Sequence, residues 1–242
     1  MDAFLSLCCE DPPPPNAGLA IIPASKYAGV YRFTYNNQTY FHKTFHARNW
    51  LESVKNHIRS TRAARSLAGH ELLSRYGFFT PEVVAIGHAK HRNFAVTTAV
   101  PDAFSAYAFL ESCANGDDVI SPHHKKHMIR KLGSIVGKMH SLRIVHGDLL
   151  CGNILLSETS RAGDYECYFI DNERTRRYPF LPAKLRLKNL VQLNKVSGHL
   201  ATKTDRMLFF KHYIRHNPEI ARRKNQWVNK IRRETNRRLA KK

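Results

Sequence analysis

The chain has 242 residues, of which 43% are hydrophobic and 10% are aromatic. This composition allows one or two domains with a sizeable buried core, and it excludes a globally disordered chain, a collagen and a coiled coil. The 39 Lys and Arg residues outnumber the 19 Asp and Glu residues, which gives a formal net charge of +20. Such an excess favours an anionic partner, such as a nucleic acid, an acidic membrane surface or a phosphorylated substrate.

The cysteines and the N-terminus indicate the cellular compartment. The five cysteines are an odd number without a C-x-x-C motif, which is typical of reduced thiols rather than of zinc sites or disulfides. The N-terminus lacks the basic start and the long apolar stretch of a secretory signal. No apolar run approaches the roughly 18–20 residues of a membrane-spanning helix. We therefore expect a cytoplasmic protein, with at most a peripheral membrane contact.

Residues 1–18 form a predicted extension that contains a stiff Asp-Pro-Pro-Pro-Pro run. Apolar or alternating residues then predict strands over 19–24, 30–35 and 38–45. The Asn36-Asn37 pair tolerates positive φ angles, and it predicts a tight hairpin turn between the last two of these strands.

A helical pattern follows over 50–76, in one or two pieces, and Gly77 is a typical end for such a helix. Two more short strands are predicted over 83–86 and 94–100. Together with the preceding hairpin, these segments predict five strands with one helix inserted after the third.

The second half of the chain has a mainly helical pattern. Ser121-Pro122 begins a helix whose apolar residues recur with helical periodicity for about twenty residues. A short strand at 144–145 and a small hairpin within 154–170 follow, and further helices are expected between 185 and 216.

The sharpest chemical signal is His146-Gly147-Asp148, with Asn153 five residues after the aspartate. Asp171 stands eighteen residues beyond Asn153, at the end of an apolar strand, and Lys43 lies on the third predicted strand. This order and spacing resemble the catalytic loop, metal-binding aspartate and phosphate-binding lysine of the protein-kinase-like fold. The resemblance implies a bilobal α+β fold, with a small five-stranded N-lobe that carries one helix and a mainly helical C-lobe.

Phosphoryl transfer from ATP would give each of these residues a role. Asp148 would orient the attacking hydroxyl and accept its proton, and Lys43 would fix the nucleotide phosphates. Asn153 and Asp171 supply the hard oxygen ligands that Mg²⁺ prefers. His146 completes the predicted catalytic set with Asp148 and Lys43, and its expected role is to brace the loop.

Further nucleotide contacts are predicted from their positions along the chain. Glu71 is the carboxylate expected to position Lys43, and Glu52, nearer the helix start, is the alternative. Gly29 stands near the first turn, and the base would lie where the fifth strand leaves the small lobe. The predicted nucleotide-binding set is Lys43, Glu71, Gly29, Thr97, Thr98 and Val100.

Two departures from the protein-kinase pattern point to a subfamily. There is no run of three glycines for the phosphates, and Asp171 is followed by Asn172-Glu173-Arg174 with no later Ala-Pro-Glu. Both departures disfavour a regulated protein kinase. The segment 170–176 resembles the metal segment of the bacterial lipopolysaccharide kinases, which phosphorylate inner-core heptose or Kdo. Further similarity to that family lies in the segments 62–87, 188–193 and 204–213.

The lipopolysaccharide kinase resemblance implies ATP-dependent phosphorylation of a core sugar hydroxyl, of heptose in preference to Kdo. It divides the chain into an extension (1–18), an N-lobe (19–100), a C-lobe (101–220) and a basic tail (221–242). The enzyme would act at the cytoplasmic face of the bacterial inner membrane. There the tail, with ten Lys and Arg residues against one acid, would contact the anionic membrane or the substrate.

Other interpretations remain open. A small atypical protein kinase or a small-molecule phosphotransferase would use the same site on another acceptor. A non-catalytic nucleic-acid-binding protein on an inherited kinase-like fold would explain the basic charge. Two features argue against the nucleic-acid-binding interpretation: the four site residues are all present, and the sequence lacks an RNA-binding aromatic signature. We therefore expect no nucleic-acid partner. Binding of Mg²⁺-ATP would separate the enzymes from this last interpretation, and acceptor screening would separate the kinases.

Overall fold

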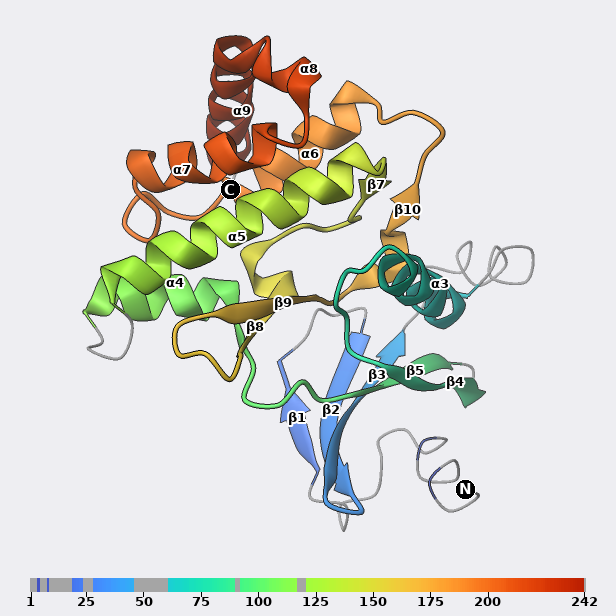
Figure 1. Ribbon diagram of the computed structural model, residues 1–242. Helices are drawn as coiled ribbons and strands as arrows, with labels where there is room; N and C mark the ends of the chain where they lie inside the picture. Colours follow the sequence, from blue (N-terminus) through green and yellow to red (C-terminus); the bar gives the residue numbers. More distant parts are fainter. Residues whose placement is uncertain are drawn as a thin grey trace. The chain divides into compact units, whose positions relative to one another are not determined.

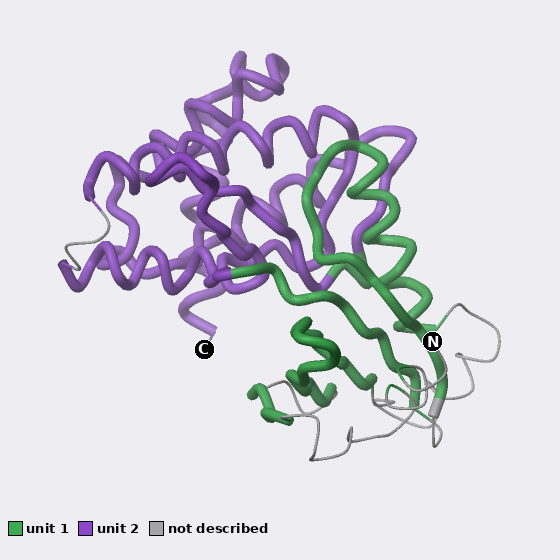
Figure 2. The backbone as a smooth tube through the Cα atoms, turned by 60° about the horizontal axis from the view of Figure 1, so that its bottom comes forward, with its two compact units in different colours: residues 1–101, 172–174 green, residues 102–171, 175–242 purple. Residues whose placement is uncertain are grey.

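The structure is a computed structural model. It describes Phe4, Cys8 and residues 19–23, 28–45, 61–89, 92–116 and 121–241. The chain divides into two compact units, the first of residues 1–101 and 172–174 and the second of residues 102–171 and 175–242 (Figure 2). Within the described ranges, every helix is too short or too polar to traverse a lipid bilayer. Apart from Phe4 and Cys8, the predicted extension lies outside the described residues.

In the described part of the first unit, five strands form an antiparallel sheet in the order β1-β2-β3-β5-β4 (Figure 1). These strands are β1 (Ala20–Ile22), β2 (Ala28–Tyr35), β3 (Gln38–Phe45), β4 (Val83–Ala89) and β5 (Arg92–Thr98). Asn36 and Asn37 form the turn between β2 and β3 with φ angles of 48° and 60°, a conformation that asparagine tolerates. The predicted hairpin and the predicted α+β fold class are both confirmed.

Helix α3 (Arg62–Arg75) covers part of this sheet and packs against β4 and β5. The Thr61 side chain caps its first turn, where its oxygen accepts a hydrogen bond from the backbone N–H of Ala64 at 3.2 Å. Helix and sheet share a small buried cluster of Phe45, Ala63 and Ala95. A second buried cluster on the sheet contains Cys8, Phe33, Phe94 and Val96. The helix predicted over 50–76 is thus present from residue 62, and its earlier part lies outside the described residues.

The second unit is mainly helical. Its helices are α4 (Ala106–Asn115), α5 (Pro122–Ser141), α6 (Ala183–Leu193), α7 (Lys203–Ile214), α8 (Pro218–Ala221) and α9 (Lys224–Leu239). Strands β6 (Phe104–Ser105), β8 (Ile154–Glu158) and β9 (Tyr165–Phe169) form one small antiparallel sheet, and β7 (Ile144–Val145) pairs with β10 (Arg176–Arg177). Two short 3₁₀ turns, η2 (Cys151–Asn153) and η3 (Asn172–Arg174), interrupt the chain near the predicted site, and η3 belongs to the first unit.

Helices α5 and α7 lie side by side in the second unit (Figure 1). Two glycines of α5 permit this close approach. A Cβ atom at Gly133 would lie 2.5 Å from the carbonyl oxygen of Phe209, and one at Gly137 would lie 2.7 Å from that of Tyr213. The helix begins after Ser121, whose side chain caps it as the sequence predicts.

The basic C-terminal segment is a packed helix rather than a simple tail. Helix α9 packs against α6, and the side-chain amide of Asn194 donates a hydrogen bond to the Thr235 hydroxyl at 2.8 Å. Thr235 is buried, whereas most of the Lys and Arg side chains of α9 are exposed. One side of α9 is therefore fixed to the second unit, and the other presents positive charge to solvent.

Candidate active site

His146 braces the loop that follows β7. Its Nε2 atom donates a hydrogen bond to the carbonyl oxygen of Ile170 at 3.0 Å, and its Nδ1 atom accepts one from the backbone N–H of Asp148 at 3.2 Å. These partners require a ring with its proton on Nε2. The side chain is fully buried, so its two ring nitrogens hold the loop against the end of β9. This placement agrees with the bracing role expected for His146.

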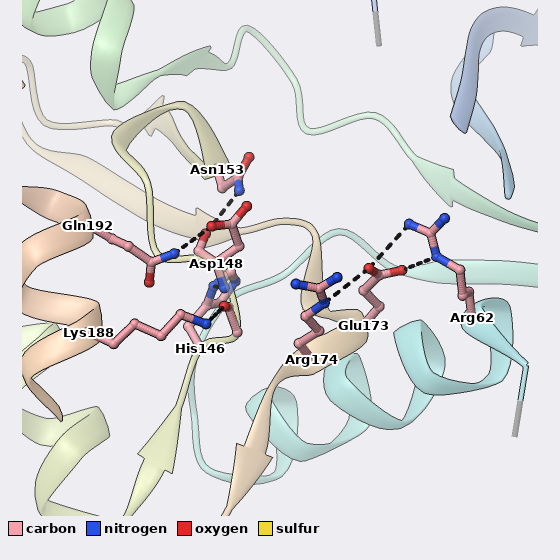
Figure 3. Close-up of polar contacts among 9 residues, drawn as sticks. Arg62, His146, Asp148, Asn153, Glu173, Arg174, Lys188 and Gln192 are labelled. Atoms are coloured by element: carbon pink, nitrogen blue, oxygen red, sulfur yellow. Dashed lines mark hydrogen bonds and ion pairs between the residues drawn. The ribbon is translucent and has the colours of Figure 1, made fainter. Parts of the chain in front are cut away.

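Asp148 is half-buried and is held from helix α6 (Figure 3). The side-chain amide of Gln192 donates to its Oδ1 atom at 2.5 Å. One turn earlier on α6, the Lys188 ammonium donates to the carbonyl oxygen of Gly147 at 2.8 Å. Helix α6 therefore contacts both the backbone of the loop and the carboxylate of its aspartate.

Asn153 and Asp171 lie at the same end of the β8–β9 hairpin. Asn153 directly precedes β8 and Asp171 follows β9 by two residues, and the backbone N–H of Ile170 donates to the carbonyl oxygen of Asn153 at 3.1 Å. Asp171 is exposed and has a φ angle of 63°. A left-handed conformation is uncommon for a residue other than glycine, and such conformations cluster at functional sites.

The residues at this end of the hairpin fit a Mg²⁺ ion. The amide nitrogen of Asn153 donates to the carbonyl oxygen of Asp148 at 2.9 Å, so the amide oxygen is the atom left for a metal. With the Asp171 carboxylate, it offers hard oxygen donors. The described residues contain no group of three His, Cys, Asp or Glu side chains suited to hold a metal. This sparse ligand set suits Mg²⁺, which usually relies on one or two carboxylates together with substrate phosphates.

In the first unit, Lys43 lies on β3, where it pairs with Ala95 of β5. Its Nζ atom lies 5.6 Å from the centre of the Phe45 ring. Glu71 is exposed on α3 and makes no ion pair with Lys43 in this structure. The structure therefore does not bring Lys43 together with its expected carboxylate, and the alternative, Glu52, lies outside the described residues.

The other predicted nucleotide-binding residues also lie in the first unit. Gly29 pairs with Thr44 across β2 and β3, and a Cβ atom at Gly29 would lie 2.7 Å from the Thr44 hydroxyl oxygen. Packing in the sheet thus accounts for this glycine. Thr97 and Thr98 end β5 and Val100 follows two residues later, all three half-buried. Their roles in nucleotide binding stay predictions.

The sequence gives no hint of an ion pair that anchors the segment after Asp171. The Arg62 guanidinium binds the Glu173 carboxylate through two hydrogen bonds, of 2.7 and 3.2 Å (Figure 3). Only about a tenth of each side chain is exposed. The neighbouring Asn172 amide donates to the Thr80 hydroxyl at 2.9 Å. These contacts within the first unit fix the η3 turn that begins directly after Asp171.

Cys151 is the one cysteine inside the catalytic loop. It is buried, and burial raises the pKa of its thiol to about 12, although the Arg206 charge acts in the opposite direction. A thiol that stays protonated is a poor nucleophile and a poor target for oxidants. The burial of Cys151 fits the packing role that we expect for it.

A loop of this kind lies between a short strand and a hairpin that ends in aspartate. In a chain that also contains a five-stranded antiparallel sheet, such a loop is typical of the protein-kinase-like class. The model of the Lipopolysaccharide kinase (Kdo/WaaP) family matches residues 21–213. The chain therefore belongs to the lipopolysaccharide kinase family, as its sequence predicts, and family membership implies a phosphotransferase that uses ATP.

A solved structure agrees with this assignment of the fold. The structure titled "WaaP in complex with acyl carrier protein" is similar with a TM-score of 0.64 and 20% sequence identity, over 91% of this chain and 89% of that chain. At this identity the likeness establishes the kinase-like fold alone. A search of curated proteins found no match to the chain.

Proposed function

We propose that the protein is an ATP-dependent kinase that phosphorylates a sugar hydroxyl of the lipopolysaccharide inner core, with heptose preferred over Kdo. Membership of the lipopolysaccharide kinase family supports the substrate class. The observation that carries the proposal is the His146–Asp148 loop, in which the buried His146 ring accepts a hydrogen bond from the backbone N–H of Asp148 and the buried Gln192 amide donates one to the Asp148 carboxylate.

The chemistry assigned to Asp148 is that of a general base. Its carboxylate orients the acceptor hydroxyl and accepts its proton as the hydroxyl oxygen bonds to the terminal phosphorus of ATP. The bond from that phosphorus to the bridging oxygen breaks, and ADP leaves. The carbonyl oxygen of Asp148 accepts hydrogen bonds from Asn153 and from the backbone N–H of Leu150, which fix the backbone from which the carboxylate projects.

The remaining site residues bind the nucleotide. Asn153, through its amide oxygen, and Asp171, through its carboxylate, would hold Mg²⁺. When bound, the ion would neutralise charge on the phosphates. Lys43 supplies a cation for the phosphates, a role that does not require the carboxylate partner expected from the sequence. His146 keeps the loop closed and takes no part in proton transfer, because both of its ring nitrogens bind backbone atoms.

The exposed charge of α9 supports a location at the cytoplasmic face of the bacterial inner membrane. Basic residues that project from the surface of this helix and its flanks are Arg222, Arg223, Lys224, Lys230, Arg232, Arg233, Arg237 and Lys241. Each Lys or Arg near an anionic leaflet contributes about 1 kcal/mol of attraction. A peripheral contact through α9 would bring the enzyme to the glycolipid core before export.

Two substitutions separate the proposed roles. Asp148→Ala should reduce phosphoryl transfer by about 10³-fold or more, while Mg²⁺-ATP binding persists because the phosphate and metal ligands remain. Asp171→Ala should abolish Mg²⁺-dependent ATP binding. Calorimetric titration with ATP, with and without Mg²⁺, measures the binding, and radiolabel from ATP measures the transfer.

The control for both variants is Glu111→Ala, which removes an exposed acid from α4 and should leave binding and transfer unchanged. Normal turnover by either aspartate variant would overturn the proposed function.

A further inference from the structure

A continuous chain of buried hydrogen bonds crosses the second unit and ends on Asp148. Its members, in order, are Arg186, Tyr213, His140, Asn189 and Gln192, and all five are buried. The successive distances between donor and acceptor atoms are 2.9, 2.9, 3.2, 3.1 and, for the last step onto Oδ1 of Asp148, 2.5 Å. These hydrogen bonds link helices α5, α6 and α7 to the loop that carries Asp148.

In this series of hydrogen bonds, each donor lies on the Arg186 side and each acceptor on the Asp148 side. Arg186 can only donate, so the Tyr213 oxygen accepts, and the Tyr213 proton is available to Nδ1 of His140. Nε2 of His140 then donates to the Asn189 oxygen, and the Asn189 nitrogen donates to the Gln192 oxygen. Hydrogen bonds that run from a cation to a carboxylate polarise one another, which strengthens each of them.

The Gln192 amide is fixed in a single orientation. Its oxygen accepts a hydrogen bond from the backbone N–H of Leu149 at 3.3 Å, in addition to the one from Asn189. A half-turn of the amide would set its NH₂ group against two donors and its oxygen against the Asp148 carboxylate. Buried polar groups strongly favour arrangements in which each has a partner, so the NH₂ group faces Asp148.

We propose that Gln192 is a positioning residue for phosphoryl transfer, which holds Oδ1 of Asp148 and leaves Oδ2 to the acceptor hydroxyl. Among the residues that the structure describes, no hydrogen bond reaches Oδ2. Asn189 supports the same loop by donating to the carbonyl oxygen of His146 at 2.6 Å. The inference rests on the proposed function, because it assumes that Asp148 is the proton acceptor.

Two substitutions distinguish positioning from simple packing. Gln192→Glu keeps an oxygen for Leu149 and Asn189 but replaces the donor to Asp148 with a second carboxylate oxygen. Gln192→Met keeps the length of the side chain and removes both the oxygen and the donor. A purely structural role therefore predicts that the methionine variant is the more impaired of the two, because it leaves buried donors unsatisfied. The positioning role predicts the reverse order for kcat.

The experiment measures kcat and KM of the full-length chain with Mg²⁺-ATP and dephosphorylated lipopolysaccharide core. We expect Gln192→Glu to lower kcat about 100-fold and Gln192→Met about 10-fold, with the KM for ATP changed less than about threefold, because a small misplacement of a reacting group costs rate rather than nucleotide affinity. Circular dichroism monitors folding. Should the glutamate variant not fold, the methionine variant carries the test alone.

The matched control is Gln38→Glu, the same chemical change at an exposed position at the start of β3, which should leave kcat unchanged. A glutamate variant that folds and keeps the wild-type kcat would overturn the inference, as would a greater loss of kcat in the methionine variant. If only the methionine variant folds, a kcat equal to that of the wild type would overturn the inference. A different result would contradict the proposed function itself, namely that the wild-type chain transfers no phosphate at all.

Discussion

At the scale of single residues, the second unit contains a buried histidine outside the catalytic loop. His140 is 1% exposed, and its two ring nitrogens contact the Tyr213 hydroxyl and the Asn189 amide. The pKa of His140 is lowered to about 3, chiefly because the ring is buried. The Asn189 hydrogen bond raises this pKa by a smaller amount, and the Arg186 charge lowers it. The ring is therefore neutral in the folded protein at neutral pH.

This buried ring predicts a loss of stability in mild acid. The pKa of His140 in the folded protein lies below the unfolded value of 6.5, so protonation favours the unfolded chain. The neutral His140 ring therefore contributes to the free energy of unfolding above about pH 6.5, and this contribution is lost as the pH falls toward 3. We expect His140 to account for about 3 kcal/mol of the stability lost between pH 7.5 and pH 4.5.

Urea unfolding of the wild type and of His140→Gln at both pH values measures this effect, since glutamine does not titrate. The variant should lose less stability than the wild type over the same interval. Equal losses in the two proteins would contradict the assignment.

Single residues also show what sequence can and cannot predict about a site. Asp148, Asn153 and Asp171 are recognisable because the chemistry demands those residue types at a set spacing. Gln192 stands forty-four residues from the aspartate that it contacts, and a lone glutamine on a helix follows no pattern. Glu71 was expected to pair with Lys43 because it lies on the next helix, but its place on the exposed side of α3 depends on packing.

At the scale of elements, α3 and the η3 turn are in close contact within the first unit. Gly69 of α3 permits this contact, because a Cβ atom there would lie 2.1 Å from the carbonyl oxygen of Asn172. The Arg62–Glu173 ion pair secures the same two elements. The turn that starts directly after Asp171 is thus held by both packing and charge.

Gly69→Ala should therefore destabilise the protein and impair Mg²⁺-ATP binding. The added methyl group meets backbone, which cannot move aside cheaply, so we expect a loss of about 2 kcal/mol in unfolding free energy. Displacement of η3 would also shift the neighbouring Asp171. Urea unfolding and calorimetric ATP titration measure the two effects.

Gly198→Ala serves as the control, because a Cβ atom there meets no other atom within 4 Å. If Gly69→Ala matched this control in both measurements, the close contact between α3 and η3 would have no role in stability or in nucleotide binding.

Elements with a strong local signal could be predicted from the sequence. The β2–β3 hairpin follows from its asparagine turn, and α5 follows from its cap and its apolar periodicity. Helix α4 was missed, because its ten residues lie close after a short strand and have no charged first turn. The packing of α9 was missed as well, since its Lys and Arg residues dominate the pattern while the contact with α6 depends on few side chains, among them Thr235.

At the scale of the whole molecule, the charge of +20 should make binding to anionic membranes strong and dependent on salt. The double substitution Arg232→Glu and Arg233→Glu alters two exposed residues of α9 without touching its contact with α6. We expect it to weaken binding to vesicles of phosphatidylglycerol and phosphatidylethanolamine by about 100-fold or more, because each charge near the surface contributes about 1 kcal/mol.

Vesicle co-sedimentation at low and high salt measures this binding, and salt should weaken the wild type as well. Removal of the whole helix would be a poorer test, because it would uncover α6, the helix that carries Gln192. Unchanged binding by the double variant would show that α9 is not the membrane contact.

Transfer of the terminal phosphate of ATP to the lipopolysaccharide core can be measured with a labelled nucleotide. Purified chain, Mg²⁺ and ATP labelled in its terminal phosphate are incubated with dephosphorylated core, with Asp148→Ala as the control. We predict label in the glycolipid with the wild type alone, on heptose rather than on Kdo. ATP binding without such label would contradict the proposed acceptor and point to a protein or small-molecule substrate, and a chain that does not bind ATP would contradict the kinase assignment itself.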